Sequence, residues 1–263
     1  MIGLPPPVEI ERVDPPSPAE FERRFRRRHQ PVVVRGLVDH WPAFRRWSLR
    51  SLAERVDDAT VPVLPVQGSA VRVDARRGLV TQPMALRDLL AEMESGEARS
   101  YMMALPEELP PALRADIGTL RYAEGALWSR TKVWFSTSGT RSSLHFDLGE
   151  NLHAQLVGRK RFTLFAPSDR ANLYPQPLFT GVPNMSGVDL DDLDLRRFPR
   201  AARAQPWVCE LEPGETLFMP RGWWHHVASL ESSISVNTWW ARGAWLAVII
   251  ASGTFKRLYG ISR

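Results

Sequence analysis

Polar and apolar residues alternate along short runs in the second half of the chain, and the clearest run extends from residue 150 to residue 157. Side chains at alternate positions of a strand project to opposite faces, so Asn151, His153 and Gln155 share one face. The other face carries apolar residues, namely Leu152, Ala154 and Leu156. A strand of this kind fits a barrel with a polar lining and an apolar exterior packed under helices.

Runs of this type follow one another from about residue 131 to residue 240, and they predict a mainly β fold. Their spacing is typical of a double-stranded β-helix, or jelly-roll, barrel with helices at its N- and C-terminal sides. Upstream we expect an apolar strand over residues 31–37 and a helix over residues 84–93 begun by Pro83.

The N-terminal part of the chain contains a helix start. Ser17 is followed by Pro18 at the first helical position and by Glu20 three residues after the serine, which is the expected cap chemistry. Phe21 and Phe25 lie four residues apart, so both can be buried on one side of the helix.

The apolar segment near the end of the chain, residues 244–251, is too short to cross a bilayer, which takes about 20 residues. We therefore expect no membrane span. The segment predicts a helix that either mediates a homodimer or packs back on its own barrel. On this basis we expect the chain to have two parts, a main domain over residues 1–242 and a C-terminal helix over residues 243–263.

The composition fits one globular unit. The chain has 263 residues, of which 44% are hydrophobic, and it contains ten tryptophans, so it can bury a sizeable core. Cys209 is the single cysteine, which excludes an intramolecular disulfide. No signal peptide is apparent at the start, and we expect a reducing, cytoplasmic location.

Two histidines and one aspartate form the most informative pattern. His145 and Asp147 are two residues apart, so on a strand both can point at one metal ion. A turn at residues 220–222 precedes a second expected strand over 223–229, which carries His225 and His226. By alternation only one of these two imidazoles can join the first pair. Two imidazoles and a carboxylate are the ligand set of a non-haem Fe(II) site, whereas the alternative is a surface histidine bonded to its neighbouring aspartate.

Lys160 follows a turn at Gly158, in register with Phe162 and Leu164 on an apolar row. An unpaired charge on the buried side of a strand is strongly disfavoured. We therefore expect an anionic partner, and the carboxylate of a co-substrate would supply it. The alternative is that Lys160 lies at the strand end and extends to water.

These residues carry a resemblance. The segments H-F-D, E-N-L-H-A-Q-L-V-G-R-K-R-F-T-L-F-A-P, L-E-P-G-E-T-L-F-M-P-R-G-W-W-H-H-V and S-I-S-V-N-T-W-W resemble the cupin-like JmjC family, and the similarity covers roughly residues 8 to 242. Members of that family are Fe(II)- and 2-oxoglutarate-dependent oxygenases that use O2, typified by the asparaginyl hydroxylase acting on the hypoxia-inducible factor. The resemblance implies a cupin, or jelly-roll, barrel.

The resemblance also implies roles by position. It assigns His145, Asp147 and His225 to the iron ion, and Lys160 to the distal carboxylate of 2-oxoglutarate. Further co-substrate contacts implied by the matching positions are Asn151, Asn237, Ser142 and Tyr101.

The reaction implied is hydroxylation of a C–H bond, and we favour a protein or peptide side chain as substrate. N-methyl lysine is less favoured because the sequence identifies no aromatic cage for a methylammonium group. A tRNA base or a small metabolite remains an alternative within the family. A rival of another class is a non-redox cupin that binds Zn or Mn, as an isomerase or binding module, although such a protein needs no dicarboxylate clamp.

The charge distribution raises one more alternative. The net charge is +5, and five arginines surround Phe25 in the N-terminal helix, which invites a nucleic-acid interpretation. The same pattern is typical of a solvated helix face, which we favour. Likewise, the aspartates and arginines of residues 189–200 are expected to balance one another. Trp223 and Trp239 are expected either to wall the site or to belong to the core.

Overall fold

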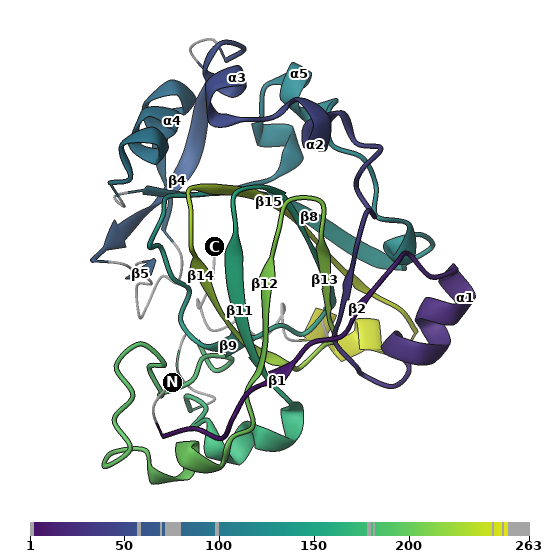
Figure 1. Cartoon of the computed structure of the whole chain (residues 1–263), viewed down its shortest axis with the longest axis vertical. Helices are drawn as coiled ribbons and strands as arrows, with labels where there is room; N and C mark the ends of the chain where they lie inside the picture. The colour runs from purple at the N-terminus through teal and green to yellow at the C-terminus, as the bar shows by residue number, and fades with distance from the viewer. Residues whose placement is uncertain are drawn as a thin grey trace.

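Two β-sheets face each other in the computed structural model (Figure 1). The structure describes residues 3–56, 59–68, 70–71, 80–97, 100–177, 180, 182–243, 245–248 and 250–251. The smaller sheet contains, in spatial order, β1 (Val8–Glu9), β12 (Trp207–Leu211), β11 (Lys160–Phe165), β14 (Trp224–Ser229) and β9 (His145–Phe146). We call it the minor sheet.

The larger, or major, sheet contains, in spatial order, β2 (Arg12–Val13), β3 (Val32–Val34), β13 (Thr216–Met219), β10 (Glu150–Val157), β15 (Ser233–Ala241), β8 (Trp128–Ser136), β7 (Ser100–Ala104), β4 (Thr60–Gln67) and β5 (Ala70–Val71), with β6 (Gln82–Ala85) paired to β4. The central pairs of both sheets are antiparallel. The predicted mainly β, jelly-roll class is confirmed, although among the described residues the strands form two facing sheets and not a closed barrel.

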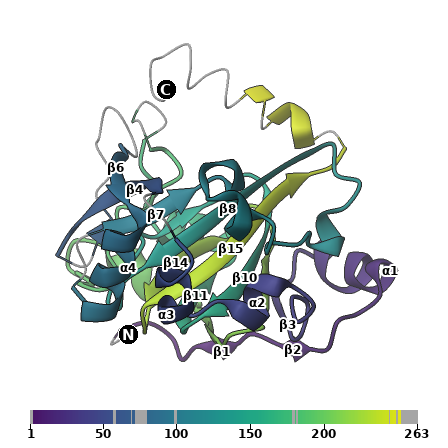
Figure 2. The same ribbon diagram turned by 90° about the horizontal axis from the view of Figure 1, so that it is seen from above.

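The helices are short. They are α1 (Pro18–Phe21), which continues into a π-helix (Glu22–Arg26), α2 (Pro42–Arg46), α3 (Leu49–Ala53), α4 (Leu86–Ser95) and α5 (Pro111–Arg114), with 3-10 turns at Pro106–Glu108, Arg121–Ala123, Pro167–Asn172 and Pro199–Arg203. Helices α2 to α5 gather at one end of the strands, and α1 lies to one side (Figures 1 and 2).

The predicted N-terminal cap is confirmed, because the Ser17 hydroxyl accepts a hydrogen bond from the Glu20 N–H at 3.2 Å. The predicted helix over residues 84–93 starts too early. Met84 and Ala85 belong to β6, where they pair with β4, and the helix begins only at Leu86. Pro83 therefore lies within an edge strand, where its missing N–H costs no ladder hydrogen bond.

The apolar face of β10 packs against the helices, as the alternation predicts. Leu152, Ala154 and Leu156 join the largest core cluster, which also contains Phe21 and Phe25 from the N-terminal helix. The opposite face of β10 consequently points between the two sheets. This arrangement directs the polar residues of the strand into the interior of the jelly roll.

The segment after β15 is helical at residues 245–248. Its Trp245 packs back on the main domain, where the indole N–H donates to the Leu148 carbonyl and the Arg221 guanidinium lies 4.8 Å from the ring centroid. Val248 and Ile250 are 40% and 59% exposed. Residues 244, 249 and 252–263 lie outside the described residues, so the boundary at residue 242 and the proposed dimer stay predictions. Within the described residues no helix has the length and apolar character needed to cross a membrane.

Candidate active site

The three predicted metal ligands lie together at the end of the minor sheet. Strand β9 pairs with β14 so that His145 lies opposite His225, and their ring centroids are 4.2 Å apart. The Nε2 atom of His225 lies 3.6 Å from Oδ2 of Asp147. One ligand atom from each residue lies within 4.8 Å of the other two, which is the spacing of ligands around a single ion.

The turn before β14 holds the two ligand segments in place. Gly222 has a φ of +79°, a conformation that glycine adopts without strain, and its N–H donates to the Asp147 carbonyl at 2.9 Å. The neighbouring Arg221 guanidinium donates to the buried Glu150 carboxylate at 2.8 Å. The turn that the sequence marks with proline and glycine therefore binds directly to the segment carrying Asp147.

The hydrogen bonds of the imidazoles set their tautomers. Nδ1 of His145 lies 2.8 Å from the Ser143 carbonyl, and Nδ1 of His225 lies 3.1 Å from the Trp223 carbonyl. A carbonyl oxygen can only accept, so each Nδ1 must carry the proton. Each Nε2 is left with a lone pair, and this is the form in which histidine binds a metal ion.

His226 faces the other way, as strand alternation requires. Its Nε2 lies 3.1 Å from Oδ2 of Asp191, on the outer side of the minor sheet. Of the histidine pair, His225 is therefore the residue that joins His145 and Asp147.

The Asp147 carboxylate is held by two donors from the major sheet. Its Oδ2 accepts hydrogen bonds from the indole N–H of Trp239 at 2.7 Å and from the Asn151 amide at 3.2 Å. Burial acts to raise the pKa of this carboxyl, but His225, His145 and the two hydrogen bonds outweigh it, so the pKa is lowered. The group is thus ionised at neutral pH. Trp239 does wall the site, whereas Trp223 lies in the core, donating to the His29 carbonyl.

Burial, with the nearby His145, lowers the pKa of His225 to about 4. A neutral imidazole beside an ionised carboxylate is ready to bind a divalent ion without first losing a proton. The side chains differ in access, because Asp147 is 24% exposed and His225 only 5%. Solvent therefore reaches the cluster from the side of Asp147 and His145, which are both partly buried.

Lys160 points inward from β11 and is 1% exposed. Its Nζ donates to the Ser235 hydroxyl at 3.3 Å and lies 5.8 Å from the Tyr101 ring centroid. No carboxylate within the described part of the chain forms an ion pair with it. Burial lowers the pKa of Lys160 to about 7. This ammonium has the surroundings of a group that needs an external anion, as the sequence predicts.

Polar side chains of β10 and β15 line the space between Lys160 and the ligand cluster. The Asn237 amide donates to the Asn151 oxygen at 3.1 Å. Asn237 Oδ1 and His153 Nε2 are buried and have no hydrogen-bond partner. Burial lowers the pKa of His153 well below its usual value, and the positive charge of Lys160 is the second cause. Unsatisfied buried polar atoms of this kind indicate a polar ligand or water in the site.

Two predicted co-substrate contacts lie in different settings. Tyr101 stands beside Lys160, and burial raises the pKa of its phenol. The Ser142 hydroxyl instead accepts a hydrogen bond from the Val227 N–H at 3.0 Å, so it also braces β14. The role of each residue toward a co-substrate stays a prediction.

The donor set fits a ferrous ion. Two imidazole nitrogens and one carboxylate oxygen converge from one side, and the exposed side of Asp147 leaves room for exogenous ligands. The unpartnered polar atoms and the unpaired ammonium of Lys160 lie on the same interior face, where a dicarboxylate would satisfy them.

Two interior residues escaped the sequence analysis. Lys132 and Trp134 lie on β8, and the register places Lys132 opposite Asn237 and Trp134 opposite Ser235. Both therefore share the interior face with the site residues. Alternation along residues 128–136 carries this signal, because Lys132, Trp134 and Ser136 fall on one face of that strand.

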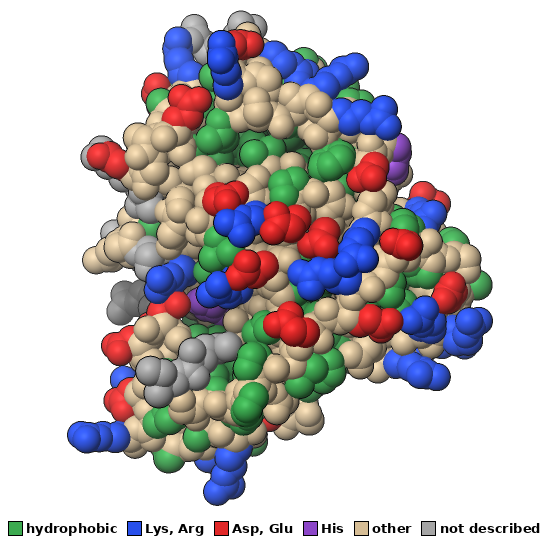
Figure 3. Space-filling view, viewed as in Figure 1, with side chains coloured by type: hydrophobic (Ala, Val, Ile, Leu, Met, Phe, Trp, Pro, Cys, Tyr) green, Lys and Arg blue, Asp and Glu red, His purple; other side chains and the backbone are tan. Residues whose placement is uncertain are grey.

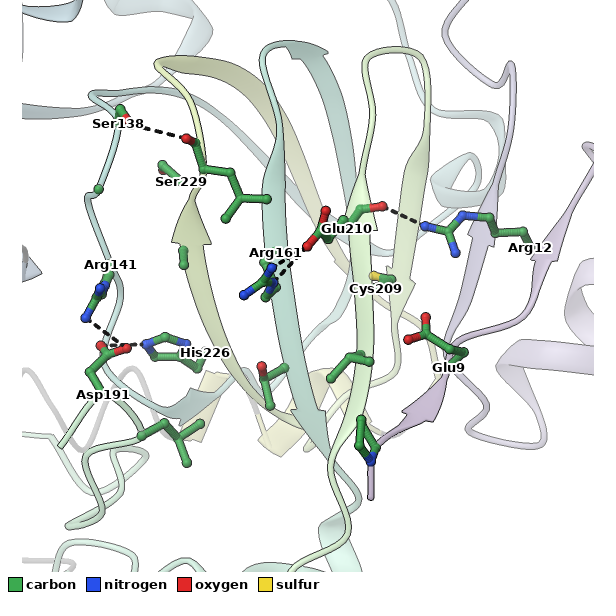
Figure 4. Close-up of a pocket in the computed structure, with 17 residues that line it drawn as sticks. Glu9, Arg12, Ser138, Arg141, Arg161, Asp191, Cys209, Glu210, His226 and Ser229 are labelled. Carbon is green, nitrogen blue, oxygen red and sulfur yellow. Dashed lines mark hydrogen bonds and ion pairs between the residues drawn. The ribbon is translucent and has the colours of Figure 1, made fainter. Parts of the chain in front are cut away.

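A cavity of about 750 Å³ lies on the outer face of the minor sheet, away from this site (Figure 4). Of its charged groups, Arg161 pairs with Glu210, and Figure 3 shows acidic and basic side chains interspersed across this face. Asp191 bonds to Arg141 at 3.1 Å and to His226. The expectation that residues 189–200 balance their own charges is thus wrong for Asp191, because its partners come from other segments.

The comparisons with known proteins agree with this geometry. A family model described as a cupin-like domain matches residues 18–244. Lysine-specific demethylase 8 of Danio rerio is 33% identical over 244 residues, covering 90% of this chain and 60% of that protein. Jumonji C domain-containing protein 5 of Drosophila melanogaster is 32% identical over 249 residues, with 88% and 60% covered.

A human relative, the bifunctional peptidase and (3S)-lysyl hydroxylase JMJD7, is 29% identical over 271 residues, covering 89% of this chain and 84% of that protein. The chain spans about three fifths of the length of the fish and fly relatives. It belongs to the cupin-like JmjC family.

Proposed function

We propose that this protein is an Fe(II)- and 2-oxoglutarate-dependent oxygenase that hydroxylates a C–H bond of a protein side chain. The observation that carries the proposal is the joint presence of the ligand cluster and the unpaired, buried ammonium of Lys160 on one interior face. In the overall reaction, substrate, 2-oxoglutarate and O2 give hydroxylated substrate, succinate and CO2.

In this proposal His145, Asp147 and His225 hold the iron ion, which supplies the oxygen chemistry when bound. Lys160 pairs with the far carboxylate of 2-oxoglutarate. Trp239 and Asn151 fix the Asp147 carboxylate and keep it ionised. The chain's own contribution is therefore to position the reactants and to exclude water, because the buried faces of both sheets enclose the co-substrate.

A protein substrate is supported by the relatives, whose names describe lysine demethylases and a lysyl hydroxylase. Hydroxylation is favoured over demethylation because the interior aromatic rings already face the chain's own ammonium groups. Lys132 lies 5.9 Å from the Trp134 ring centroid, and Lys160 lies near Tyr101. Those rings do not form an open cage for a methylammonium.

A nucleic-acid substrate is less favoured because three of the five arginines around Phe25 have carboxylate partners. Arg24 pairs with Glu11 and Glu20, and Arg26 pairs with Glu22. Paired guanidinium groups release fewer counterions on phosphate binding than free ones. The alternative from another class is a non-redox cupin that binds Zn or Mn. It is less favoured because it provides no anionic ligand for the buried ammonium of Lys160.

The test uses metal-free protein under argon. Adding Fe(II) and 2-oxoglutarate should generate a visible charge-transfer band, and the band should disappear in His225→Ala and weaken in Lys160→Ala. His226→Ala is the matched control, since it removes the adjacent imidazole from the outer face and should keep the band.

Peptide and tRNA pools are then incubated with the loaded enzyme and O2 and scanned for a product heavier by about 16 Da, the mass of one oxygen atom. A parent protein with no band would refute the oxygenase proposal and favour the non-redox cupin. A product in the tRNA pool alone would refute the protein-side-chain assignment while leaving the reaction class intact.

A further inference from the structure

Lys132 lies at the rim of the candidate site. Lys132 on β8 lies opposite Asn237 on β15. On its other side Asn237 lies opposite His153 on β10. The row formed by these three residues lies between the row of Trp239, which binds Asp147, and the row of Ser235, which binds Lys160. Lys132 is half-buried whereas Asn237 is 4% exposed, so the lysine stands nearer to solvent than the floor of the site.

The Lys132 ammonium has no strong acceptor of its own. Its Nζ donates to the thioether sulfur of Met103 at 3.0 Å, and thioethers are weak acceptors. No carboxylate within the described ranges forms an ion pair with it. Burial, with the positive charge of Arg130, lowers the pKa of Lys132 to about 8, while Glu108 and Asp147 act in the opposite direction. The group is consequently still mainly protonated at neutral pH, and an anion beside it would be stabilising.

The two carboxylates of the co-substrate do not account for this second ammonium. In the proposed function the far carboxylate pairs with Lys160, and the keto-acid end lies at the ligand cluster. Lys132 projects instead from β8, on the exposed side of the same interior face, beside Trp134 and Met103. A substrate that enters from this exposed side would pass Lys132 on its way to the cluster.

From this placement we infer that Lys132 binds a carboxylate of the substrate, so that the preferred polypeptide carries an acidic side chain at or next to the oxidised residue. The inference rests on the proposed function and narrows its substrate class. A lysine side chain of the substrate would be repelled by the like charge of Lys132, so binding of such a side chain here is disfavoured. Lys132 is thereby a specificity-determining residue.

Binding is measured under argon, so that no turnover is needed. Protein loaded with Mn(II) and 2-oxoglutarate is exposed to peptide pools in which one position is fixed as Asp or Glu, as Asn or Gln, or as Lys or Arg. The parent should enrich the acidic pools. Loss of one charge-assisted hydrogen bond corresponds to roughly ten- to hundredfold in affinity, so Lys132→Met should bind an enriched acidic peptide weaker by that factor.

The charge reversal Lys132→Glu should shift enrichment toward the Lys and Arg pools. Arg161→Met is the matched control: it removes an exposed positive charge from the outer face of the minor sheet and should change the affinity of the acidic peptide less than threefold. The 2-oxoglutarate affinity of each variant is titrated separately through the Fe(II) charge-transfer band.

Three results would overturn the inference. The first is equal enrichment of acidic and neutral pools by the parent, and the second is enrichment of the Lys and Arg pools. The third is a loss of 2-oxoglutarate affinity in Lys132→Met that matches its loss of peptide affinity, because that result would assign the ammonium to the co-substrate. Failure of the parent to form the Fe(II) band would instead refute the proposed function, and so the two failures are distinguishable.

Discussion

The Asp147 carboxylate depends on a single indole for its best hydrogen bond, since Trp239 donates to it at 2.7 Å. Trp239→Phe keeps a ring in place and removes this donor. Partners of metal ligands typically contribute 10- to 100-fold in metal affinity, so we expect Mn(II) or Fe(II) binding to weaken by about tenfold, measured by anaerobic titration. Trp134→Phe is the control, because the Trp134 N–H has no hydrogen-bond partner. Equal losses in both variants would contradict the assignment of Trp239.

Lys160 should make 2-oxoglutarate binding depend on pH. Its pKa is lowered to about 7 by burial in the ligand-free protein, and the co-substrate binds the protonated form. The ammonium is present below this pKa and is lost as the pH rises through it, so above pH 7 binding must take up a proton. We expect affinity to fall from pH 6 to pH 9, by up to about tenfold per unit above the pKa.

The measurement is a titration of the Fe(II) and 2-oxoglutarate band at each pH. Lys160→Arg provides the comparison, because a guanidinium stays charged over the whole range and should give a flatter profile. A parent profile as flat as that of the arginine variant would show that Lys160 does not bind the co-substrate.

At this scale, sequence patterns predicted the convergence of the site well but not its surroundings. The H-F-D spacing predicted that His145 and Asp147 converge, and the family resemblance selected His225 as the third member of the cluster. Alternation also put Lys160 on a buried row. Alternation along β8 groups Lys132 with Trp134 and Ser136, but only the register with Asn237 shows that this face lines the site, and register between distant segments is not visible in the sequence of one strand.

At the scale of elements, the turn between β10 and β11 determines where Lys160 lies. Gly158 has a φ of +65°, and a Cβ at this position would lie 2.3 Å from the Ser232 carbonyl oxygen. Gly158→Ala therefore combines left-handed strain with a backbone clash, and we expect a loss of about 3 kcal/mol in the free energy of unfolding, measured with urea.

Gly139→Ala is the matched control for this turn. Gly139 has a φ of +80° but open space around its missing Cβ, so its replacement should cost about 1 to 2 kcal/mol of strain alone. If the Gly158 variant were no less stable than the Gly139 variant, the contact with Ser232 would not constrain the turn.

Elements were predictable where local chemistry decided them. The cap at Ser17 and the turn at Gly158 are set by neighbouring residues, and both are confirmed. The start of α4 was wrong because Met84 and Ala85 are recruited as an edge strand by β4, a partner more than 20 residues away in the sequence. Likewise, the N-terminal helix continues as a π-helix over Glu22–Arg26. Helix propensities do not predict this wider turn.

At the scale of the whole molecule, the candidate site joins the two sheets. His145 and His225 belong to the minor sheet, whereas Asn151 and Trp239, which hold Asp147, belong to the major sheet. Lys160 of the minor sheet bonds to Ser235 of the major sheet in the same way. A bound metal ion and dicarboxylate would therefore add links across the interior of the jelly roll.

Ligand binding should consequently stabilise the whole fold. At a concentration 100 times its dissociation constant, a ligand that binds only the folded state adds about 2.7 kcal/mol, which for a domain of this size corresponds to a rise in Tm of roughly 5 to 10 °C. We expect Mn(II) and 2-oxoglutarate together to exceed the sum of their separate effects, because the keto-acid end requires the metal. Thermal melts under argon measure this difference.

The variants separate the possible outcomes of these melts. Lys160→Met should retain the shift produced by Mn(II) alone and lose most of the added shift from 2-oxoglutarate, whereas Asp147→Ala should lose both. His226→Ala, whose imidazole lies on the outer face beside Asp191, should keep the full response. A parent protein that Mn(II) stabilises but 2-oxoglutarate does not would mean that the buried ammonium serves another anion, and the dioxygenase mechanism would lose its co-substrate.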